Sequence, residues 1–408
     1  MQKNIIKYYL FQLFFGLSFS FVPFYILFMK SRGLSFAEIG MTQGIYYFAF
    51  LLFELPTGVL ADKLGRKTAI TLASIIKILA LLTSLISHSL IIFIIAEFFY
   101  SLSRALASGA TTALLYDSLL NLKEEVKFKS IQGKSYGMHL LGNTLGGSIG
   151  ALITYLSDVE YVYVLSIFMA IICTIIAILF KEPILNLEAK TEGIKHVEKN
   201  LSAYFQHTIC SFQDIIKSKY IVWIILYSAL MFNLIRSNLI SLQQPFLMFL
   251  MLPKFMFGII DTVVSLGSVI FASIAHKIEK ILTFKYLIIL IVFTQFISFL
   301  GMGSLNSKLA LGFLFIQMVA VGIYIPITRD YINFHIPNSE KRATILSFDS
   351  LISRGSFAVL SIIIGYVLDK FGVQSAMLMI SFLALMFGTV VLSVRPKDKL
   401  IPPYPITN

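Results

Sequence analysis

The stretch Gly58-Val59-Leu60-Ala61-Asp62-Lys63-Leu64-Gly65-Arg66-Lys67 is a short charged segment between two long apolar runs. Its glycines permit a tight turn and close backbone contact. Asp62, Arg66 and Lys67 must lie in water or pair at a membrane edge, because ionised side chains are costly in lipid. The stretch therefore predicts a short connector between two transmembrane helices.

The composition of the 408 residues is that of a polytopic membrane protein. Hydrophobic residues make up 57% of the chain and charged residues 13%, about half the charged fraction of a typical soluble domain. The mean hydropathy is +0.85. The apolar segments lack the alternation of barrel strands, and lipid offers no partner to unpaired backbone groups. The fold class is therefore all-α.

The length allows roughly twelve helical spans, because each span needs about 20 apolar residues. The first span follows Lys3 and Lys7 and has no small-residue cleavage site, so it is predicted to stay in the protein rather than act as a signal peptide. The spans are expected at residues 5–29, 37–61, 68–87, 90–118, 131–156, 160–180, 220–250, 255–276, 284–304, 307–330, 342–368 and 372–394.

The basic residues indicate the topology. If the N-terminus lies in the cytoplasm, most of the 33 Lys and Arg residues fall in cytoplasmic connections, as membrane proteins prefer. Both termini are therefore predicted to be cytoplasmic, and the net charge of +12 is explained without a nucleic-acid partner. The basic residues expected outside are Lys30, Arg32, Lys254, Lys308 and Lys370.

The long polar connection from Lys181 to Lys219 divides the chain. It separates an N-terminal six-helix bundle, residues 1–180, from a C-terminal six-helix bundle, residues 220–408, with a cytoplasmic linker at 181–219. Part of the linker is predicted to be an amphipathic surface helix. Its residues at helical spacing are Leu201, Tyr204, Phe205, Thr208 and Phe212.

The charged stretch resembles, position for position, a signature of the major facilitator superfamily. That signature, Gly-x-Leu-Ala-Asp-Arg-x-Gly-Arg-Lys, lies between the second and third helices, and here Lys63 replaces the first Arg. The resemblance implies two pseudo-symmetric bundles around a midplane cavity that work by alternating access. It also implies a latch, in which Asp62 lies near the start of helix 11 and Arg66 pairs with an acid at the end of helix 4.

Asp117 stands where the resemblance places that acid. An Asp–Arg pair at such an interface is a charge-assisted contact, so breaking it is expected to shift the balance between the two states. A capping or interfacial charge with no switching role is the alternative for Asp117. The predicted latch residues are Gly58, Asp62, Gly65, Arg66, Lys67 and Asp117.

Two further patterns are similar to signatures of drug:proton antiporters in that superfamily. Arg104 in the fourth span precedes Gly109, one residue later than the usual spacing. The fifth span carries Gly142, Gly146, Gly147 and Gly150, with Gly147 in place of the family's Pro. These resemblances imply efflux, whereas small residues on one helix face equally predict close helix packing.

Several charged residues fall inside the predicted spans, where each needs a partner or a water-filled cavity. Glu97 lies seven residues before Arg104 on the same helix face and is expected to pair with it, either in some states only or as a static structural pair. Glu54, before Pro56, is the first candidate proton carrier and Asp261 the second. The proton-coupling candidates are Glu54, Glu97, Arg104 and Asp261.

The basic residues at middle depth suit an anionic or carboxylate-bearing substrate, with structural ion pairs as the alternative. Polar residues of the first and seventh spans are plausible substrate contacts, because the resemblance implies that these helices line the cavity. The predicted cavity residues are Gln12, Tyr46, Lys77, Arg104, Asn233, Arg236 and Arg354.

No catalytic or metal constellation is present in the sequence. The histidines are scattered, there is no phosphate-binding loop, and the two cysteines make neither a disulfide framework nor a zinc site. We therefore expect a non-enzyme without metal or cofactor that works as a monomer in the bacterial inner membrane. Its partners are expected to be the lipid bilayer and a small-molecule substrate, and the proton gradient its energy source.

The predicted function is proton-coupled efflux of small amphipathic or drug-like molecules. The first alternative is proton-coupled uptake of a nutrient, vitamin or metal-chelate anion. The second alternative is a transporter-like receptor or lipid-handling membrane protein without solute turnover. The last alternative predicts that a continuous polar cavity is lost.

Overall fold

A computed structural model describes residues 2–183, 218–282, 284–335 and 339–396, and all its regular elements are helical. The amphipathic helix predicted around Leu201 to Phe212 lies outside the described residues. The first half contains α1 (Gln2–Leu17), η1 (Val22–Phe24), α2 (Tyr25–Ser31), α3 (Phe36–Leu64), α4 (Arg66–Ile86), α5 (Leu90–Leu120), η2 (Glu125–Lys127), α6 (Phe128–Leu156) and α7 (Glu160–Leu179).

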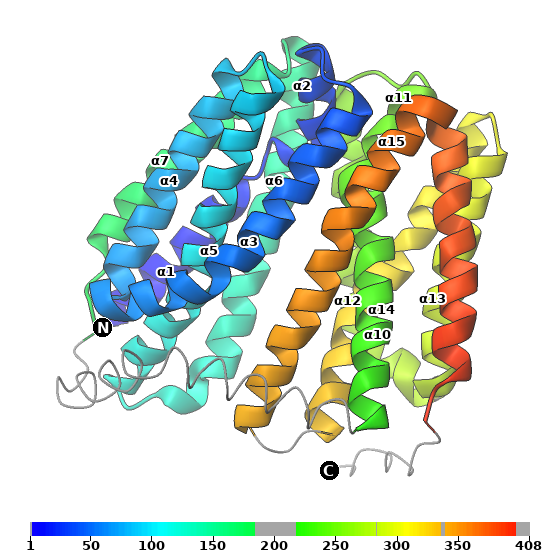
Figure 1. Cartoon of the computed structure of the whole chain (residues 1–408). Helices are drawn as coiled ribbons and strands as arrows, with labels where there is room; N and C mark the ends of the chain where they lie inside the picture. Colours follow the sequence, from blue (N-terminus) through cyan, green and yellow to red (C-terminus); the bar gives the residue numbers. More distant parts are fainter. Residues whose placement is uncertain (1, 184–217, 283, 336–338, 397–408) are drawn as a thin grey trace.

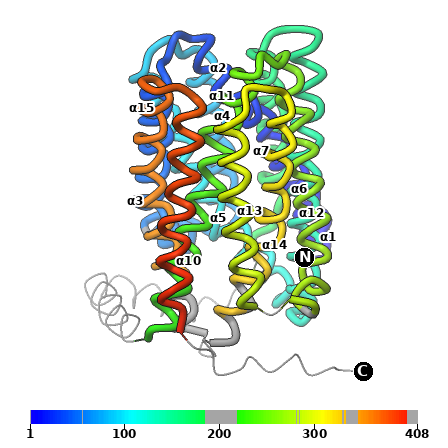
Figure 2. Tube along the Cα trace, turned by 90° about the vertical axis from the view of Figure 1, so that its right-hand side faces the viewer, coloured from blue at the N-terminus to red at the C-terminus, as the bar shows by residue number. Residues whose placement is uncertain are grey.

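The second half begins after the undescribed part of the linker. It contains α10 (Lys219–Arg236), η3 (Ser237–Leu242), α11 (Gln243–Phe249), α12 (Phe255–Ile281), α13 (Phe284–Ser304), η4 (Lys308–Ala310), α14 (Leu311–His335) and α15 (Ser339–Ser393). We call the end where α2 and α11 lie the upper end, and the end where α1 begins the lower end (Figure 1). Figure 2 shows the long helices running between these two ends.

The first predicted span, 5–29, coincides with one segment long and apolar enough to cross a membrane, Gln2–Ser31, and its helix is interrupted within that segment. α1 ends at Leu17, and a 3-10 turn with Pro23 in its first positions precedes α2. Proline has no N–H to continue a helix. The Ser18 hydroxyl donates to the Phe15 carbonyl at 2.7 Å, and such a bond partly satisfies the last turn of a helix, whose carbonyls lack helical partners.

The seventh predicted span, 220–250, also coincides with one segment long and apolar enough to cross a membrane, Lys219–Phe249, and its helix is irregular. A π-helical segment, Ser237–Leu242, joins α10 to α11. Pro245 lies three residues into α11 and cannot donate a helical hydrogen bond to the preceding turn. π-Helical turns are rare in proteins and often occur at functional sites.

Ten helical segments among the described residues are long and apolar enough to cross a membrane. α6, which is rich in glycine and polar residues, is not one of them. The last segment, Ile345–Ser393, contains Gly372, whose φ of 80° interrupts the helix between the predicted spans 342–368 and 372–394. The all-α polytopic fold is confirmed, and the count of twelve spans stays a prediction.

The two halves meet at the upper end, where α3 packs on α15 and α6 packs on α12. A Cβ atom on Gly40 would lie 2.5 Å from the Ser361 carbonyl oxygen, and one on Gly258 would lie 2.3 Å from that of Gly147. The backbones therefore touch there. Figure 1 shows α3 and α15 diverging toward the lower end, where a Cβ on Gly58 would meet no atom within 4 Å.

Candidate functional site

The charged stretch, residues 58–67, lies at the lower end, where α3 ends and α4 begins; we call it the charged hairpin. Arg66 forms an ion pair with Asp62 one turn earlier, and its Nε lies 3.5 Å from Oδ2 of Asp117 on α5. Both contacts stay within the first half, and they join the hairpin to the end of α5. The pairing of Arg66 with Asp117 is present, while the role of these residues as a latch stays a prediction.

Glu182, just after α7, binds the backbone of the charged hairpin. Its carboxylate accepts hydrogen bonds from the backbone N–H groups of Arg66 at 2.6 Å and Lys67 at 2.8 Å. These groups begin α4 and have no partner within the helix. Gly65 has a φ of 93°, and a Cβ on it would lie 2.9 Å from Glu182 Oε1. The sequence analysis missed Glu182, because it lies more than a hundred residues from the N–H groups that it binds.

Two cations share one aromatic cluster inside the first half. Lys77 on α4 is 1% exposed, and its Nζ lies 3.6 Å from the Phe19 ring centroid and 4.3 Å from that of Phe15. The Arg104 guanidinium carbon lies 5.4 Å from the same Phe19 centroid. The Lys77 ammonium donates to the Ser18 hydroxyl. Within the described part of the chain, neither cation forms an ion pair.

His139 on α6 also lies in this cluster. Its ring centroid lies 5.8 Å from that of Phe19, with the two planes nearly perpendicular. Its Nδ1 is buried and has no hydrogen-bond partner among the described residues. Gln12 lies close to His139 and Tyr8. The sequence analysis missed His139, Phe15 and Phe19, because histidines and phenylalanines are scattered along the chain.

Among the described residues Glu97 forms no ion pair with Arg104, so the static pair is absent from this structure, while pairing in other states stays a prediction. The carboxylate is 8% exposed and faces the hydroxyl of Tyr25, which also lies 3.1 Å from the Thr42 hydroxyl oxygen. The physical reason is the break in the first span. It places Tyr25 at the start of α2, in front of Glu97.

A row of aromatic rings runs from this cluster to the second half. The ring of Tyr46 on α3 lies 5.7 Å from that of Tyr100 and 5.0 Å from that of Tyr47. Tyr47 in turn lies 4.9 Å from Phe357 on α15 and 6.2 Å from Phe232 on α10. Tyr46 also contacts the Arg104 guanidinium. The row therefore connects the cations of the first half with the opposite half.

Arg236 and Arg354 lie at the other end of the aromatic row. The Arg354 guanidinium carbon lies 4.1 Å from the Phe50 centroid, and that of Arg236 lies 5.4 Å from the Phe232 centroid. The charged groups that act on Arg354 include Glu54 of the opposite half and Arg236. Both arginines are partly exposed. The structure thus brings the predicted residues Glu54, Arg236 and Arg354 together.

The amide nitrogen of Asn233, a predicted cavity residue, is engaged in hydrogen bonds within the protein. Its Nδ2 donates to the Ser356 hydroxyl at 2.7 Å and to the Ala229 carbonyl at 2.8 Å. Its Oδ1 is buried without a partner among the described residues. The residue therefore joins α10 to α15 and leaves one acceptor unused.

Asp261 lies away from these clusters, where α6 packs on α12. Its Oδ2 would lie 3.6 Å from a Cβ on Gly147, and the neighbouring Thr262 hydroxyl oxygen lies 3.1 Å from that of Ser148. Asp261 is thus part of the upper contact between the halves. The structure does not place it with Glu54 or Arg104.

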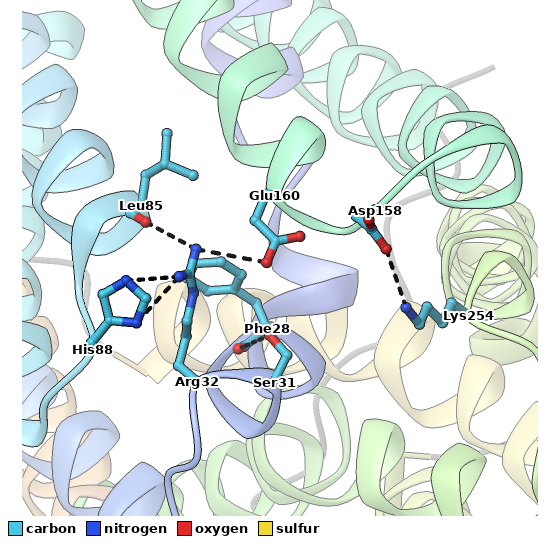
Figure 3. A network of polar contacts seen from close by, with 8 residues as sticks. All are labelled: Phe28, Ser31, Arg32, Leu85, His88, Asp158, Glu160 and Lys254. Carbon is cyan, nitrogen blue, oxygen red and sulfur yellow. Dashed lines mark hydrogen bonds and ion pairs between the residues drawn. The ribbon is translucent and has the colours of Figure 1, made fainter.

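Polar side chains close the upper end. Gln244 on α11 accepts hydrogen bonds from the Ile26 and Leu27 N–H groups at 2.8 and 3.2 Å and donates to the Val22 carbonyl at 2.9 Å. In Figure 3, Asp158 and Lys254 point toward each other from the two halves, with Oδ1 and Nζ 3.6 Å apart.

Arg32 holds the upper end of the first half together (Figure 3). It lies 3.6 Å from Glu160 and 3.0 Å from His88 Nε2, and it donates to the Leu85 carbonyl at 3.2 Å. These contacts connect the end of α2 with the end of α4 and the start of α7. Arg32 therefore links three helix ends at the upper surface of this half.

The sequence matches the Major Facilitator Superfamily over residues 8–348. It is 23% identical over 401 residues to the uncharacterized MFS-type transporter YxaM of Bacillus subtilis, covering 93% of this chain and 92% of that relative. It is 33% identical over 144 residues to the uncharacterized transporter BU466 of Buchnera aphidicola. That second match spans only 35% of each chain.

Solved structures share the fold at low sequence identity. A mutant form of the nucleoside transporter NupG has a TM-score of 0.76 at 13% identity, covering 96% of this chain and 98% of that one. A POT family transporter in complex with 5-aminolevulinic acid scores 0.72 at 11% identity, covering 98% and 97%. A D-xylose–proton symporter scores 0.68 at 13% identity, covering 94% and 96%. At such identities the likeness extends to the fold alone.

Proposed function

Because the chain belongs to the Major Facilitator Superfamily, we propose that it is a secondary transporter that carries a small amphipathic anion by alternating access. In this proposal the solute binds between the two halves, at the level of the aromatic row. The proposal is supported by the close contact of the halves at the upper end, and by the charged and aromatic side chains of Arg354 and Phe50, which meet across the two halves.

The proposal that the substrate is an anion depends on one observation: the two cations Lys77 and Arg104 both lie over the rings of Phe15 and Phe19. Aromatic faces stabilise a cation by about 0.5–2 kcal/mol, far less than the cost of burying an isolated charge. A bound carboxylate supplies the missing counter-charge, and the rings around it suit an apolar body. This favours the predicted anion over a cationic drug-like molecule.

In the proposed coupling step, Glu54 carries the proton. It lies across the interface from Arg354, and the charges of the two residues interact. A proton on Glu54 removes its attraction for Arg354, so it weakens a contact between the halves. Proton binding and conformational change are then linked, because the ligand binds one state better than the other. Asp261, at the upper contact, is the second candidate.

Efflux, the direction predicted from the Arg104–Gly109 pattern of α5, the glycines of α6 and the aromatic composition, has less support than transport itself. A Cβ on Gly142 would lie 2.1 Å from the Leu13 carbonyl oxygen, and one on Gly146 would lie 2.7 Å from the Ser20 hydroxyl oxygen. Tight packing of α6 on α1 therefore accounts for these glycines. The measurement of direction in the assay below decides between efflux and uptake.

The proposal is tested by flux into and out of proteoliposomes under an imposed pH gradient. The solutes are matched sets of aromatic and aliphatic compounds, each as carboxylate, amide and amine. We expect carboxylates to be transported and their amides and amines to be transported much less. Transport confined to amines or neutral compounds would contradict the anionic class. The absence of any turnover would favour the receptor or lipid-handling alternative.

A further inference from the structure

The pattern of the charged hairpin occurs a second time, at the opposite end of the molecule. Residues Gly365-Tyr366-Val367-Leu368-Asp369-Lys370-Phe371-Gly372 repeat the Gly, Asp, Lys and Gly positions of 58–65, with aliphatic or aromatic residues at all other places. The closing glycines share a left-handed φ, 93° at Gly65 and 80° at Gly372. Both copies thus end a long helical stretch in the same way, α3 at the lower end and the first part of α15 at the upper end.

The carboxylate of the second copy bridges the two halves. Asp369 Oδ1 accepts a hydrogen bond from the Phe36 N–H at 3.0 Å, and Oδ2 accepts one from the Ala37 N–H at 2.6 Å. These are the first N–H groups of α3, which have no partner within the helix. A carboxylate there is also favoured by the helix dipole.

The contact lies next to the closest approach of the halves. A Cβ on Gly365, one turn before Asp369, would lie 2.4 Å from the Phe36 carbonyl oxygen. The Ser361 hydroxyl donates to the Gly40 carbonyl at 3.3 Å. The two N–H bonds to Asp369 therefore cannot persist if α3 and α15 separate at the upper end.

We propose that Asp369 locks the upper end shut and is the counterpart of Asp62 at the lower end. The inference rests on the proposed alternating access. In the state described here, Asp369 is bound across the halves, while Asp62 is paired with Arg66 in its own half. When the lower end closes, Asp62 reaches the start of α15, and Asp369 releases α3. The two aspartates thus stabilise opposite states.

The test reports opening of the upper end by the reactivity of one buried thiol. The parent protein carries Ser361→Cys in a background with Cys173→Ser and Cys210→Ser, and labelling by a maleimide is timed in detergent and in nanodiscs. Ser361 is 0% exposed in the closed state. Loss of a helix-capping carboxylate costs about 1 kcal/mol, so Asp369→Asn is expected to raise the labelling rate roughly fivefold.

Four further variants make the result specific. Asp62→Asn is expected to lower the labelling rate, the double variant to return it toward the parent rate, and Lys370→Gln, next to Asp369, to leave it unchanged. Asp369→Glu keeps the negative charge, so this variant is expected to be labelled as slowly as the parent. Slow labelling of Asp369→Glu would show that the faster labelling of Asp369→Asn comes from the lost charge and not from misfolding.

Two results would overturn the assignment in different ways. An unchanged rate in Asp369→Asn, together with a changed rate in Asp62→Asn, would reject Asp369 as a lock and leave alternating access intact. A thiol at position 361 that never reacts in any folded variant would mean that the upper end does not open. That result would reject the lock and the proposed function together.

Discussion

At the scale of single residues, the surroundings of Lys77 are the most informative feature. The side chain is buried with one hydroxyl and two phenyl rings as neighbours, and Arg104 adds a second positive charge beside the same ring. Like charges beside the same ring repel each other, and the repulsion is stronger away from water. An anion between or beside the two groups relieves this repulsion. This is the physical basis of the proposed substrate class.

Replacement of Lys77 by Met tests that basis. Met keeps an unbranched apolar stem and removes the charge, so the fold should be retained. We expect carboxylate transport to fall by roughly tenfold or more, the size of a lost charge-assisted hydrogen bond, while transport of any neutral analogue changes little. Initial uptake rates in proteoliposomes give the comparison.

The matched control for this variant is Lys127→Gln, since Lys127 pairs with Glu124 on the exposed lower surface. The control is expected to transport like the parent. Carboxylate transport at the parental rate in Lys77→Met would show that Lys77 is only a structural cation.

Glu54 offers a second test at this scale. Glu54→Gln keeps the side-chain shape but cannot gain or lose a proton. We expect solute exchange down its own gradient to continue, while the stimulation by a pH gradient is lost. The control is Glu124→Gln on the surface. Stimulation that remains as strong as in the parent would remove Glu54 as the proton carrier and leave Asp261 as the next residue to test.

The sequence predicted some residues of this site and missed others for physical reasons. Lys77, Arg104 and Arg354 were identifiable, because a charge within an apolar run requires an explanation. Phe15 and Phe19 were not, because the chain has 37 phenylalanines and only the fold determines which of them face a cation. The neighbour of Glu97 in this structure, Tyr25, was not predicted, because its position depends on the break after α1.

At the scale of elements, hydropathy located the long helices but not the breaks within them. The 3-10 turn at Pro23 and the π-helical segment before Pro245 occur at prolines that were visible in the sequence. Proline predicts a defect, but the packing of the neighbouring helices decides whether a helix bends, narrows or ends. The same holds for Gly372, where only the backbone shows a left-handed turn.

The glycines of α6 give a prediction about helix packing. A Cβ on Gly142 would clash with the backbone of Leu13, whereas one on Gly137, on the same helix, would meet no atom within 4 Å. We expect Gly142→Ala to destabilise the protein by about 1–3 kcal/mol, the usual cost of overpacking. Gly137→Ala should be neutral or slightly stabilising, because alanine favours helix.

Thermal unfolding in detergent separates the two alanine variants. The midpoint should fall for Gly142→Ala and stay level or rise for Gly137→Ala. If both variants unfold at the parental temperature, α6 does not pack on α1 as closely as the structure has it.

At the scale of the whole molecule, the two halves are joined at one end by backbone contact, by Gln244, by the Asp158–Lys254 pair and by Asp369. At the other end the charged hairpin is paired within the first half. Such an arrangement is one of two states that a transporter with a fixed central site must adopt in turn. The central claim is therefore that the upper contact opens during every transport cycle.

A reversible cross-link across the upper end measures this most directly. Asp158→Cys and Lys254→Cys are combined in a background with Cys173→Ser and Cys210→Ser, and joined by a bifunctional methanethiosulfonate whose links are cleaved by a reductant. Each single-cysteine variant treated with the same reagent is the control. The cross-linked protein is expected to bind its solute without transporting it, and reduction of the links is expected to restore transport. Transport at the uncross-linked rate by fully cross-linked protein would mean that the upper contact does not open during transport.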